Sequence, residues 1–192
     1  MAIYLVRHGE TEWTLAGRHT GTTDLPLTQR GEAQAAGLKA DLAALSFARV
    51  MVSPRRRAIR TAELAGFAGR LEVDPRLAEY DYGQYEGLTA AEIDARQPGW
   101  ELWRDGCPGG EMPVQVLARA WKLLAGLPLS AEDNSVLFGH GHILRAVAAA
   151  HLGLPVSFCA SLILKVASIS VLASEHNHPA IDSWDLTQPA AG

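Results

Sequence analysis

Residues 2–11 have the sequence Ala-Ile-Tyr-Leu-Val-Arg-His-Gly-Glu-Thr, and this stretch decides the fold. The apolar run at 2–6 favours a short buried strand. We expect Gly9 to let the backbone turn sharply just beyond that strand. Arg7 and His8 would then lie at the carboxyl end of a strand, where open α/β sheets place their ligands.

Length and composition point to an ordinary globular domain. The chain has 192 residues, 48% of them hydrophobic, so we expect one domain over residues 1–192. It contains no apolar run long enough to span a membrane, and its amino end leads into the first strand without signal-peptide features. Cys107 and Cys159 are too few for a disulfide framework. We therefore expect a cytoplasmic protein that binds no membrane.

The charge pattern argues against one class of partner and favours another. The formal net charge is −4, whereas nucleic-acid binding usually requires a basic face. Only three of the basic residues are lysine, so arginine predominates. Arginine makes bidentate contacts with phosphate. We nevertheless expect Arg55, Arg56 and Arg60 to be solvated helix residues.

Strand and helix patterns alternate along the chain. Apolar runs predict strands at 2–6, 49–53, 71–73, 135–138 and 168–173. Amphipathic patterns predict helices at 28–45, 55–66, 113–126 and 142–152. Strands separated by helices indicate a mostly parallel sheet between helical layers. A frayed tail is expected over 187–192.

The stretch from 75 to 112 breaks this rhythm. It is rich in Gly, Pro, Trp and Tyr. Long loops inside compact domains tend to be functional. We expect an irregular insertion that forms the wall or cap of an active site.

Polar residues follow the predicted strands. The first strand is followed by Arg7 and His8, and the second by the helix that carries Arg57. The strand ending at 138 is followed by His140, and the insertion contributes Glu79. Because the carboxyl ends of parallel strands meet at one edge of a sheet, we expect these groups to lie together.

Four motifs support this convergence. They are Arg7 to Thr11 with Trp13; Ser53 to Ala58 with Thr61 and Ala62; Glu79 with Gly83, Glu86 and Gly87; and His140-Gly141. In kind and order they resemble the histidine phosphatase superfamily, also called the phosphoglycerate mutase-like family. The resemblance implies a three-layer α/β/α sandwich with a mixed, mainly parallel sheet.

The residue types explain the chemistry that this resemblance implies. A phosphomonoester carries about two negative charges, so a neutral imidazole can attack it where an anion would be repelled. His8 would attack through one ring nitrogen, while the other donates its proton to a carbonyl near Gly9. Arg7, Arg57 and a protonated or donor His140 would surround the phosphoryl oxygens.

The leaving alkoxide needs a proton, and Glu79 would supply it as general acid before taking a proton from water in the hydrolytic step. That role requires a protonated carboxyl. A bound phosphate dianion should raise the pKa of Glu79, which favours an acidic or near-neutral optimum. This chemistry needs no metal and no cofactor.

Other side chains carry less specific signals. Glu10 and Glu86 are expected to hold loops or arginines in position. His19 and His142 either line the pocket or pack against it, and the sequence leaves both open. The stretch His176-Asn177-His178 is expected to lie in a surface loop and not in a metal site.

Departures from the mutase pattern favour a phosphatase. Trp13 is followed by Thr14 where phosphoglycerate mutases have asparagine, and Ala90 stands where they carry a substrate-binding lysine. The longer basic insertion of those enzymes is missing. Mutase-type phosphoryl transfer is the alternative, and a non-catalytic phosphoester-binding protein is a further one.

Two stretches, 103–111 and 139–145, resemble a subgroup with broad acid phosphatases and a sedoheptulose bisphosphatase. Substrate contacts are expected from Thr14, Thr20, Gly21, Tyr82, Gly141 and His142, with Trp13 and either Trp100 or Trp103 as further wall. Such a pocket suits a small sugar or polyol phosphate. Cys107 is expected to be an inert thiol at its rim. A homodimer is left open, because apolar surface and core share one pattern.

Overall fold

The computed structural model describes residues 2–127 and 133–187, which contain a six-stranded mixed sheet of order β3-β2-β4-β1-β5-β6. In sequence order the strands are β1 (Ile3–Arg7), β2 (Arg49–Val52), β3 (Glu72–Val73), β4 (Ser135–Gly139), β5 (Ile169–Glu175) and β6 (His178–Leu186). The strands β1 to β4 run parallel, whereas β5 and β6 are antiparallel to their neighbours. The expectation of a mixed, mainly parallel sheet is confirmed.

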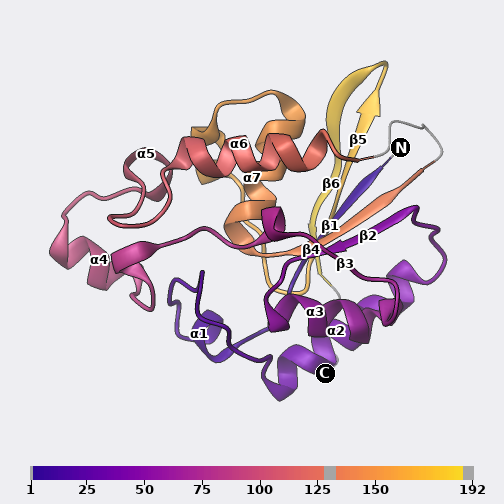
Figure 1. Ribbon diagram of the computed structural model, residues 1–192, viewed down its shortest axis with the longest axis horizontal. Helices are drawn as coiled ribbons and strands as arrows, with labels where there is room; N and C mark the ends of the chain where they lie inside the picture. Colours follow the sequence, from indigo (N-terminus) through magenta and orange to yellow (C-terminus); the bar gives the residue numbers. More distant parts are fainter. Residues whose placement is uncertain (1, 128–132, 188–192) are drawn as a thin grey trace.

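Helices cover both faces of this sheet (Figure 1). One face carries α2 (Gln29–Leu42), α3 (Arg56–Ala62) and the π-helical segment η1 (Glu63–Phe67), and the other carries α6 (Pro113–Leu124) and α7 (Gly141–Leu152). The short elements are α1 (Glu12–Leu15), α4 (Ala90–Arg96) and α5 (Leu102–Asp105), with 3₁₀ turns η2 (Pro75–Leu77), η3 (Gly83–Tyr85) and η4 (Val156–Ser161). This is the expected three-layer sandwich.

The central strand β4 contributes to both hydrophobic cores. Leu137 belongs to the core beneath α6 and α7, whereas Val136 and Phe138 belong to the core beneath α2 and α3. All three side chains have no exposed surface. This alternation is the period of two that a strand imposes, and it lets one strand anchor both helical layers.

The glycine after β1 is required for a reason other than the expected turn. Gly9 does not have a positive φ. A Cβ on Gly9 would lie 2.3 Å from the Gly31 carbonyl oxygen, and one on Gly31 would lie 2.1 Å from the Glu10 carbonyl oxygen. The start of α2 therefore packs directly on the backbone that follows β1, and this contact excludes any side chain.

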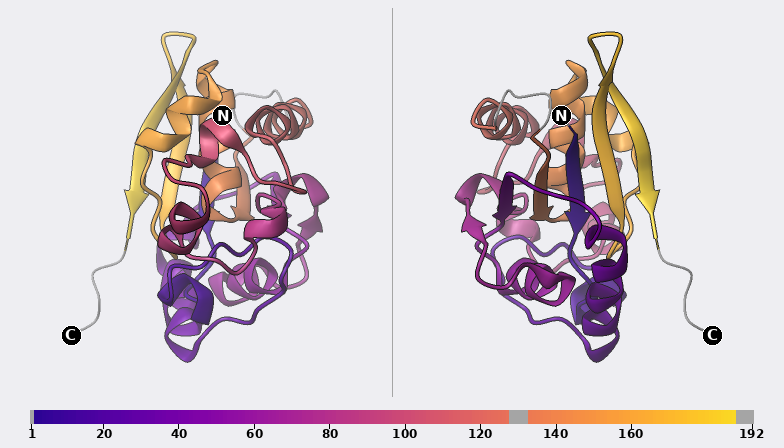
Figure 2. Two further views of the ribbon diagram at one scale, coloured as in Figure 1. Left: turned by 90° about the vertical axis from the view of Figure 1, so that its left-hand side faces the viewer. Right: turned by 90° about the vertical axis from the view of Figure 1, so that its right-hand side faces the viewer.

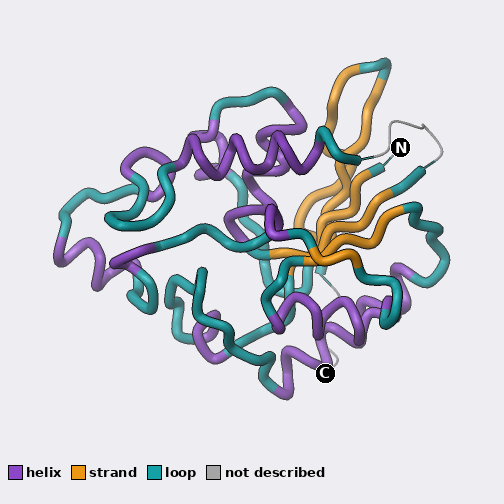
Figure 3. Tube along the Cα trace, in the orientation of Figure 1, coloured by secondary structure: helices purple, strands orange, loops and turns teal. Residues whose placement is uncertain are grey.

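The segment 75–112 is more ordered than expected. It contains α4 and α5 as well as two 3₁₀ turns, so the prediction of an irregular insertion is wrong in this respect (Figure 3). Thr89 caps α4, and Glu92 returns a hydrogen bond to the Thr89 backbone. The spacing Thr-x-x-Glu is the sequence signature of such a capping box.

The antiparallel hairpin formed by β5 and β6 extends beyond the other strands (Figure 2). Strand β6 was not expected from the sequence. His176 and Asn177 form the turn with φ angles of 50° and 65°, the positive values that two-residue hairpin turns require and Asn tolerates. Of the predicted tail, residues 188–192 lie outside the described residues. Over the described ranges, no helix is long and apolar enough to cross a membrane.

Candidate active site

The carboxyl ends of three parallel strands define one edge of the sheet. Arg7 of β1 pairs with Gly139 of β4, and Val52 of β2 pairs with Phe138. The residues that follow are linked across the same edge, because the His8 N–H donates to the Gly139 carbonyl. The structure thus brings His8, Arg7, Arg57, His140 and Glu79 to one place, as their positions after the strands imply.

His8 is held in the geometry of a nucleophile. Its Nδ1 lies 2.7 Å from the carbonyl oxygen of Gly9, to which it donates, so the lone pair is on Nε2. The ring lines a cavity yet is only 4% exposed. Burial, together with the charges of Arg57 and Arg7, holds the pKa of His8 well below its usual value. The imidazole is therefore neutral at neutral pH.

Arg57 and His140 form the back of the site, and both are fully buried. Arg57 Nε donates to His140 Nδ1 at 3.2 Å, so the proton of this ring is on Nε2, which lies 2.7 Å from Ser53 Oγ. Burial and the positive charge of Arg57 lower the pKa of His140 well below its usual value. Of the two expected states of His140, protonated or donor, this environment favours the neutral donor.

Arg7 lines the cavity from the side. Its Nη1 donates to the Leu164 carbonyl, and its Nε is buried with no hydrogen-bond partner among the described residues. Gly141 explains how the guanidinium fits, because a Cβ there would lie 3.3 Å from Arg7 Cζ. Gly141 is buried and makes room for Arg7, and among the described residues it does not line the cavity described below.

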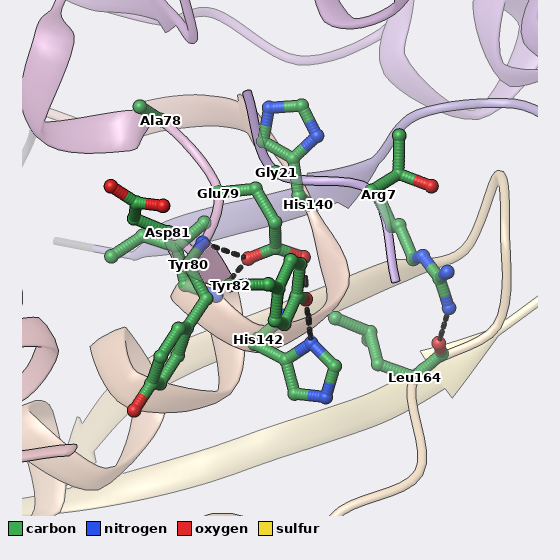
Figure 4. Close-up of polar contacts among 12 residues, drawn as sticks. Arg7, Gly21, Ala78, Glu79, Tyr80, Asp81, Tyr82, His140, His142 and Leu164 are labelled. Carbon is green, nitrogen blue, oxygen red and sulfur yellow. Dashed lines mark hydrogen bonds and ion pairs between the residues drawn. The ribbon is translucent and has the colours of Figure 1, made fainter. Parts of the chain in front are cut away.

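Glu79 is bound by the amino end of α7 (Figure 4). Its Oε1 accepts from the N–H groups of Tyr80 and Ile143, both at 2.9 Å, and its Oε2 accepts from the His142 N–H at 3.0 Å. Burial alone would raise the pKa of this carboxyl, but the hydrogen bonds from His142 hold it well below its usual value. The first N–H groups of a helix and its dipole favour a carboxylate.

The expected rise in the pKa of Glu79 concerned the carboxyl beside a bound phosphate, and it stays a prediction. The hydrogen bonds of the protein itself favour the ionised carboxyl. A raised pKa, as a general acid needs, would require the charge of a bound phosphate.

A cavity of about 180 Å³ opens next to His8. It is lined by Arg7, His8, Thr14, Gly17, Arg18, His19, Thr20, Glu79, Tyr82 and His142. The expected contact residues Thr14, Thr20, Tyr82 and His142 thus lie where a substrate would bind. Among the described residues, Gly21 does not line this cavity.

Two imidazoles stand in the wall of this cavity. The rings of His19 and His142 are nearly parallel, with centroids 6.3 Å apart. His19 Nδ1 donates to the Leu88 carbonyl at 2.9 Å, and His142 Nδ1 lies 2.5 Å from the Tyr82 hydroxyl and 3.6 Å from Glu79 Oε2. Burial lowers the pKa of His142 to about 4. Both rings line the pocket, which the sequence had left open.

The tryptophans lie behind this wall. Trp100 packs edge-on against His19 with centroids 5.7 Å apart, and Trp103 lies 5.4 Å from the His142 ring. Within the described part of the chain, Trp13, Trp100 and Trp103 do not line the cavity, so the expectation of a tryptophan wall is wrong. Cys107 is buried in the core and not at the rim, and burial raises its pKa to about 12.

Two further lining residues, Gly17 and Arg18, were not predicted from the sequence. Arg18 Nη1 donates to the Gly87 carbonyl at 2.6 Å and to Glu92 at 3.1 Å. The one indication in the sequence that they could line the pocket was their position next to His19. No group of three or more metal-ligating side chains occurs within residues 2–127 and 133–187.

Comparison with protein families gives one match over nearly the whole chain. The model of the histidine phosphatase superfamily (branch 1) matches residues 3–187. An acid phosphatase of Mycobacterium tuberculosis is 42% identical over 91% of this chain and 87% of its own. Sedoheptulose 1,7-bisphosphatase of Saccharomyces cerevisiae is 35% identical over 79% and 68%, and a probable phosphoglycerate mutase of Proteus mirabilis is 32% identical over 96% and 90%.

Solved structures similar to this chain include further phosphatases. The product of an open reading frame of Mycobacterium tuberculosis superposes with a TM-score of 0.92 at 39% identity, covering 97% of both chains. A mycobacterial glucosyl-3-phosphoglycerate phosphatase in complex with VO₃ gives 0.87 at 33% identity, covering 97% of this chain and 99% of its own.

Proposed function

Because the chain belongs to the histidine phosphatase superfamily, whose members are phosphatases or mutases, we propose that it is a metal-independent phosphatase of small phosphomonoesters. The observation that carries this proposal is His8, a buried neutral imidazole whose Nδ1 proton is fixed on the Gly9 carbonyl. Its Nε2 lone pair is thereby left free on a ring that lines the cavity with Arg7 and Glu79 and packs against His140, which binds Arg57.

In the first step, His8 Nε2 forms a bond to phosphorus while the bond to the leaving oxygen breaks. Glu79 gives its proton to that oxygen, which departs as an alcohol. In the second step, water transfers a proton to Glu79 and its oxygen attacks phosphorus. The P–N bond breaks, its electron pair returns to Nε2, and phosphate is released. Arg7 and Arg57 neutralise the phosphoryl oxygens in both steps.

The proton that Glu79 donates arrives with the substrate. Because the protein's hydrogen bonds favour the ionised carboxyl, Glu79 takes up this proton from a substrate that binds as the phosphate monoanion. The second pKa of a phosphomonoester is about 6, so the monoanion is lost above that pH. Once the proton has moved to Glu79, the charge of the phosphate dianion left beside it raises the proton affinity of the carboxyl. This supports an acidic to near-neutral optimum and the designation of acid phosphatase.

Hydrolysis is favoured over mutase transfer by the cations at the cavity: among the described residues no lysine lines it, and Arg18, which does, is bound to the Gly87 carbonyl and to Glu92. The three lysines lie elsewhere: Lys39 in α2, Lys122 in α6, and Lys165 paired with Asp185 at 3.2 Å. Ala90 begins α4 and offers no charge for a substrate carboxylate. A mutase must retain a bisphosphate intermediate, and the engagement of Arg18 by Glu92 argues against that role.

The wall supports sugar or polyol phosphates as substrates. His142 is neutral at neutral pH, and His19, whose Nδ1 is held by the Leu88 carbonyl, presents Nε2 as a hydrogen-bond acceptor. The hydroxyls of Thr14, Thr20 and Tyr82 complete a surface of donors and acceptors. Alcohol hydroxyls of a small leaving group match such a surface.

The first test is hydrolysis of an aryl phosphate at about pH 5–7 with and without EDTA. Wild-type activity should be insensitive to EDTA, and His8→Ala should lose about 10³-fold or more of kcat. Quenching without acid during turnover should trap a phosphohistidine in the wild type alone. Phosphate binding without turnover would instead favour a non-catalytic binding protein, and label on another residue would contradict the mechanism.

A further inference from the structure

The loop 20–23 is held between two charged side chains that lie on opposite sides of it. Its N–H groups bind a carboxylate: Glu86 Oε1 accepts from Thr23 at 2.9 Å, and both Glu86 oxygens accept from Gly21 at 3.0 Å. Its carbonyl groups bind a guanidinium: Arg57 Nη2 donates to Thr20 at 2.9 Å and Arg57 Nη1 donates to Thr23 at 2.9 Å. The loop thus connects the carboxylate to the guanidinium.

The loop is also pressed against the segment that carries Glu79. A Cβ on Gly21 would lie 2.3 Å from the Tyr80 carbonyl oxygen and 3.0 Å from Glu86 Oε2. Only glycine fits at this position, so the loop has no freedom to shift toward Tyr80. Thr20, whose carbonyl binds Arg57, itself lines the cavity.

These contacts determine how Arg57 is presented. Its Nε is bound to His140, and the loop carbonyls, including a longer contact to Gly21 at 3.4 Å, engage both Nη atoms. A guanidinium has five N–H groups, so at least one remains for a phosphoryl oxygen. The direction of that donor is set by the positions of the loop carbonyls.

We propose that Glu86 is a positioning residue for Arg57. Its carboxylate fixes the N–H groups of Gly21 and Thr23, and the loop carbonyls then aim the Arg57 guanidinium at the phosphoryl group. Among the described residues, Glu86 does not line the cavity, so it acts through the loop. The inference rests on the proposed function only in giving Arg57 the role of phosphate ligand.

Glu86→Gln tests this with little change in shape. The amide keeps one acceptor oxygen, but its NH₂ group would face N–H groups that need an acceptor. A misplaced catalytic group can cost about 10²-fold in rate, so we expect a fall of about tenfold or more in kcat/KM for an aryl phosphate. The inhibition constant of inorganic phosphate should rise in parallel.

A double-mutant cycle with Arg57→Ala separates positioning from a general structural effect. In the Arg57→Ala background, Glu86→Gln should change kcat/KM by less than about twofold, because the group it positions is gone. Equal fold losses in both backgrounds, or an unchanged phosphate inhibition constant, would overturn the proposal. Asp94→Asn is the matched control, since Asp94 also accepts a backbone N–H, that of Gly99 at 2.9 Å, but on an exposed helix.

Folding and function are checked separately. Thermal unfolding should give similar midpoints for wild type and Glu86→Gln; if that variant does not fold, Glu86→Asp must show the same dependence on Arg57. Calorimetric titration with inorganic phosphate measures Arg57 positioning without turnover. A wild type that binds phosphate but hydrolyses no ester would overturn the proposed function and leave the role of Glu86 decided by the binding data.

Discussion

The strand edge and the cavity wall are parts of one site, but they are held in different ways. At the strand edge, Arg57 and His140 are fully buried and bind each other, and His8 is buried with its Nδ1 on the Gly9 carbonyl. In the wall, His19 and His142 belong to a loop and to the first turn of α7, and each has one ring nitrogen engaged. Under the proposed function, this difference assigns phosphoryl transfer to the strand edge and the choice of leaving group to the wall.

Replacing Glu79, which joins the two regions, should have the largest effect. Glu79→Gln cannot donate a proton, and general acid catalysis contributes about 10²–10⁴-fold. We expect a loss of this size in kcat for alkyl phosphates, whose leaving groups need the proton, and a loss below about tenfold for aryl phosphates. Steady-state kinetics on both classes measures it.

Two controls accompany the Glu79 variant. The amide would place an NH₂ group near the N–H groups of His142 and Ile143, which could disturb the site. The kinetic loss is therefore assigned to proton donation only if the melting temperature and the phosphate inhibition constant stay close to wild type. Equal losses for alkyl and aryl phosphates would show that Glu79 supports the site's structure and does not deliver a proton.

A change confined to the wall should be smaller and selective. His19→Phe keeps an aromatic ring against Tyr82 and Trp100 but removes the acceptor nitrogen. Loss of one hydrogen bond to a substrate hydroxyl should lower kcat/KM for sugar phosphates about tenfold and leave aryl phosphates within about twofold.

The control for this variant is His178→Phe. His178 is exposed at the start of β6, where it pairs with Glu175 beside the hairpin turn, and it does not contribute to the site. It should change neither substrate class. If His19→Phe reduced both classes alike, the division between strand edge and wall would not hold, and His19 would belong to the machinery of phosphoryl transfer.

The strand edge could be predicted from the sequence better than the cavity wall, for a physical reason. The strand edge was predictable because strand ends and parallel pairing place His8 and His140 together without knowledge of any loop. The wall depends on how loops pack, so Trp100 and Trp103 could not be placed behind His19 and His142 from pattern alone.

The charge state of Glu79 was out of reach for the same reason. Its pKa depends on N–H groups of α7, which are more than sixty residues away in sequence. Strand β6, in contrast, could have been predicted from the sequence. Asn177 follows β5 closely, and asparagine permits the positive φ that a tight hairpin turn needs. The role of Gly9 also required the structure, since it depends on contact with Gly31.

The smallest predicted effect is on stability. Burial lowers the pKa of His8, His140 and His142 below the unfolded value of about 6.5. Below that pH the unfolded chain therefore binds more protons than the folded one, and the free energy of unfolding falls as pH falls. For His142, whose folded pKa is about 4, this loss continues down to that pH.

His142→Asn removes one of these three groups, so its free energy of unfolding should fall less steeply than that of the wild type. Between pH 7.5 and 5.5 the difference should be about 1 kcal/mol, measured by urea denaturation at several pH values. His178→Asn, at an exposed position, should keep the wild-type slope. Identical slopes for His142→Asn and wild type would mean that His142 charges freely in the folded protein. The wall would then present a cation at acidic pH, and anionic leaving groups would suit it better than polyols.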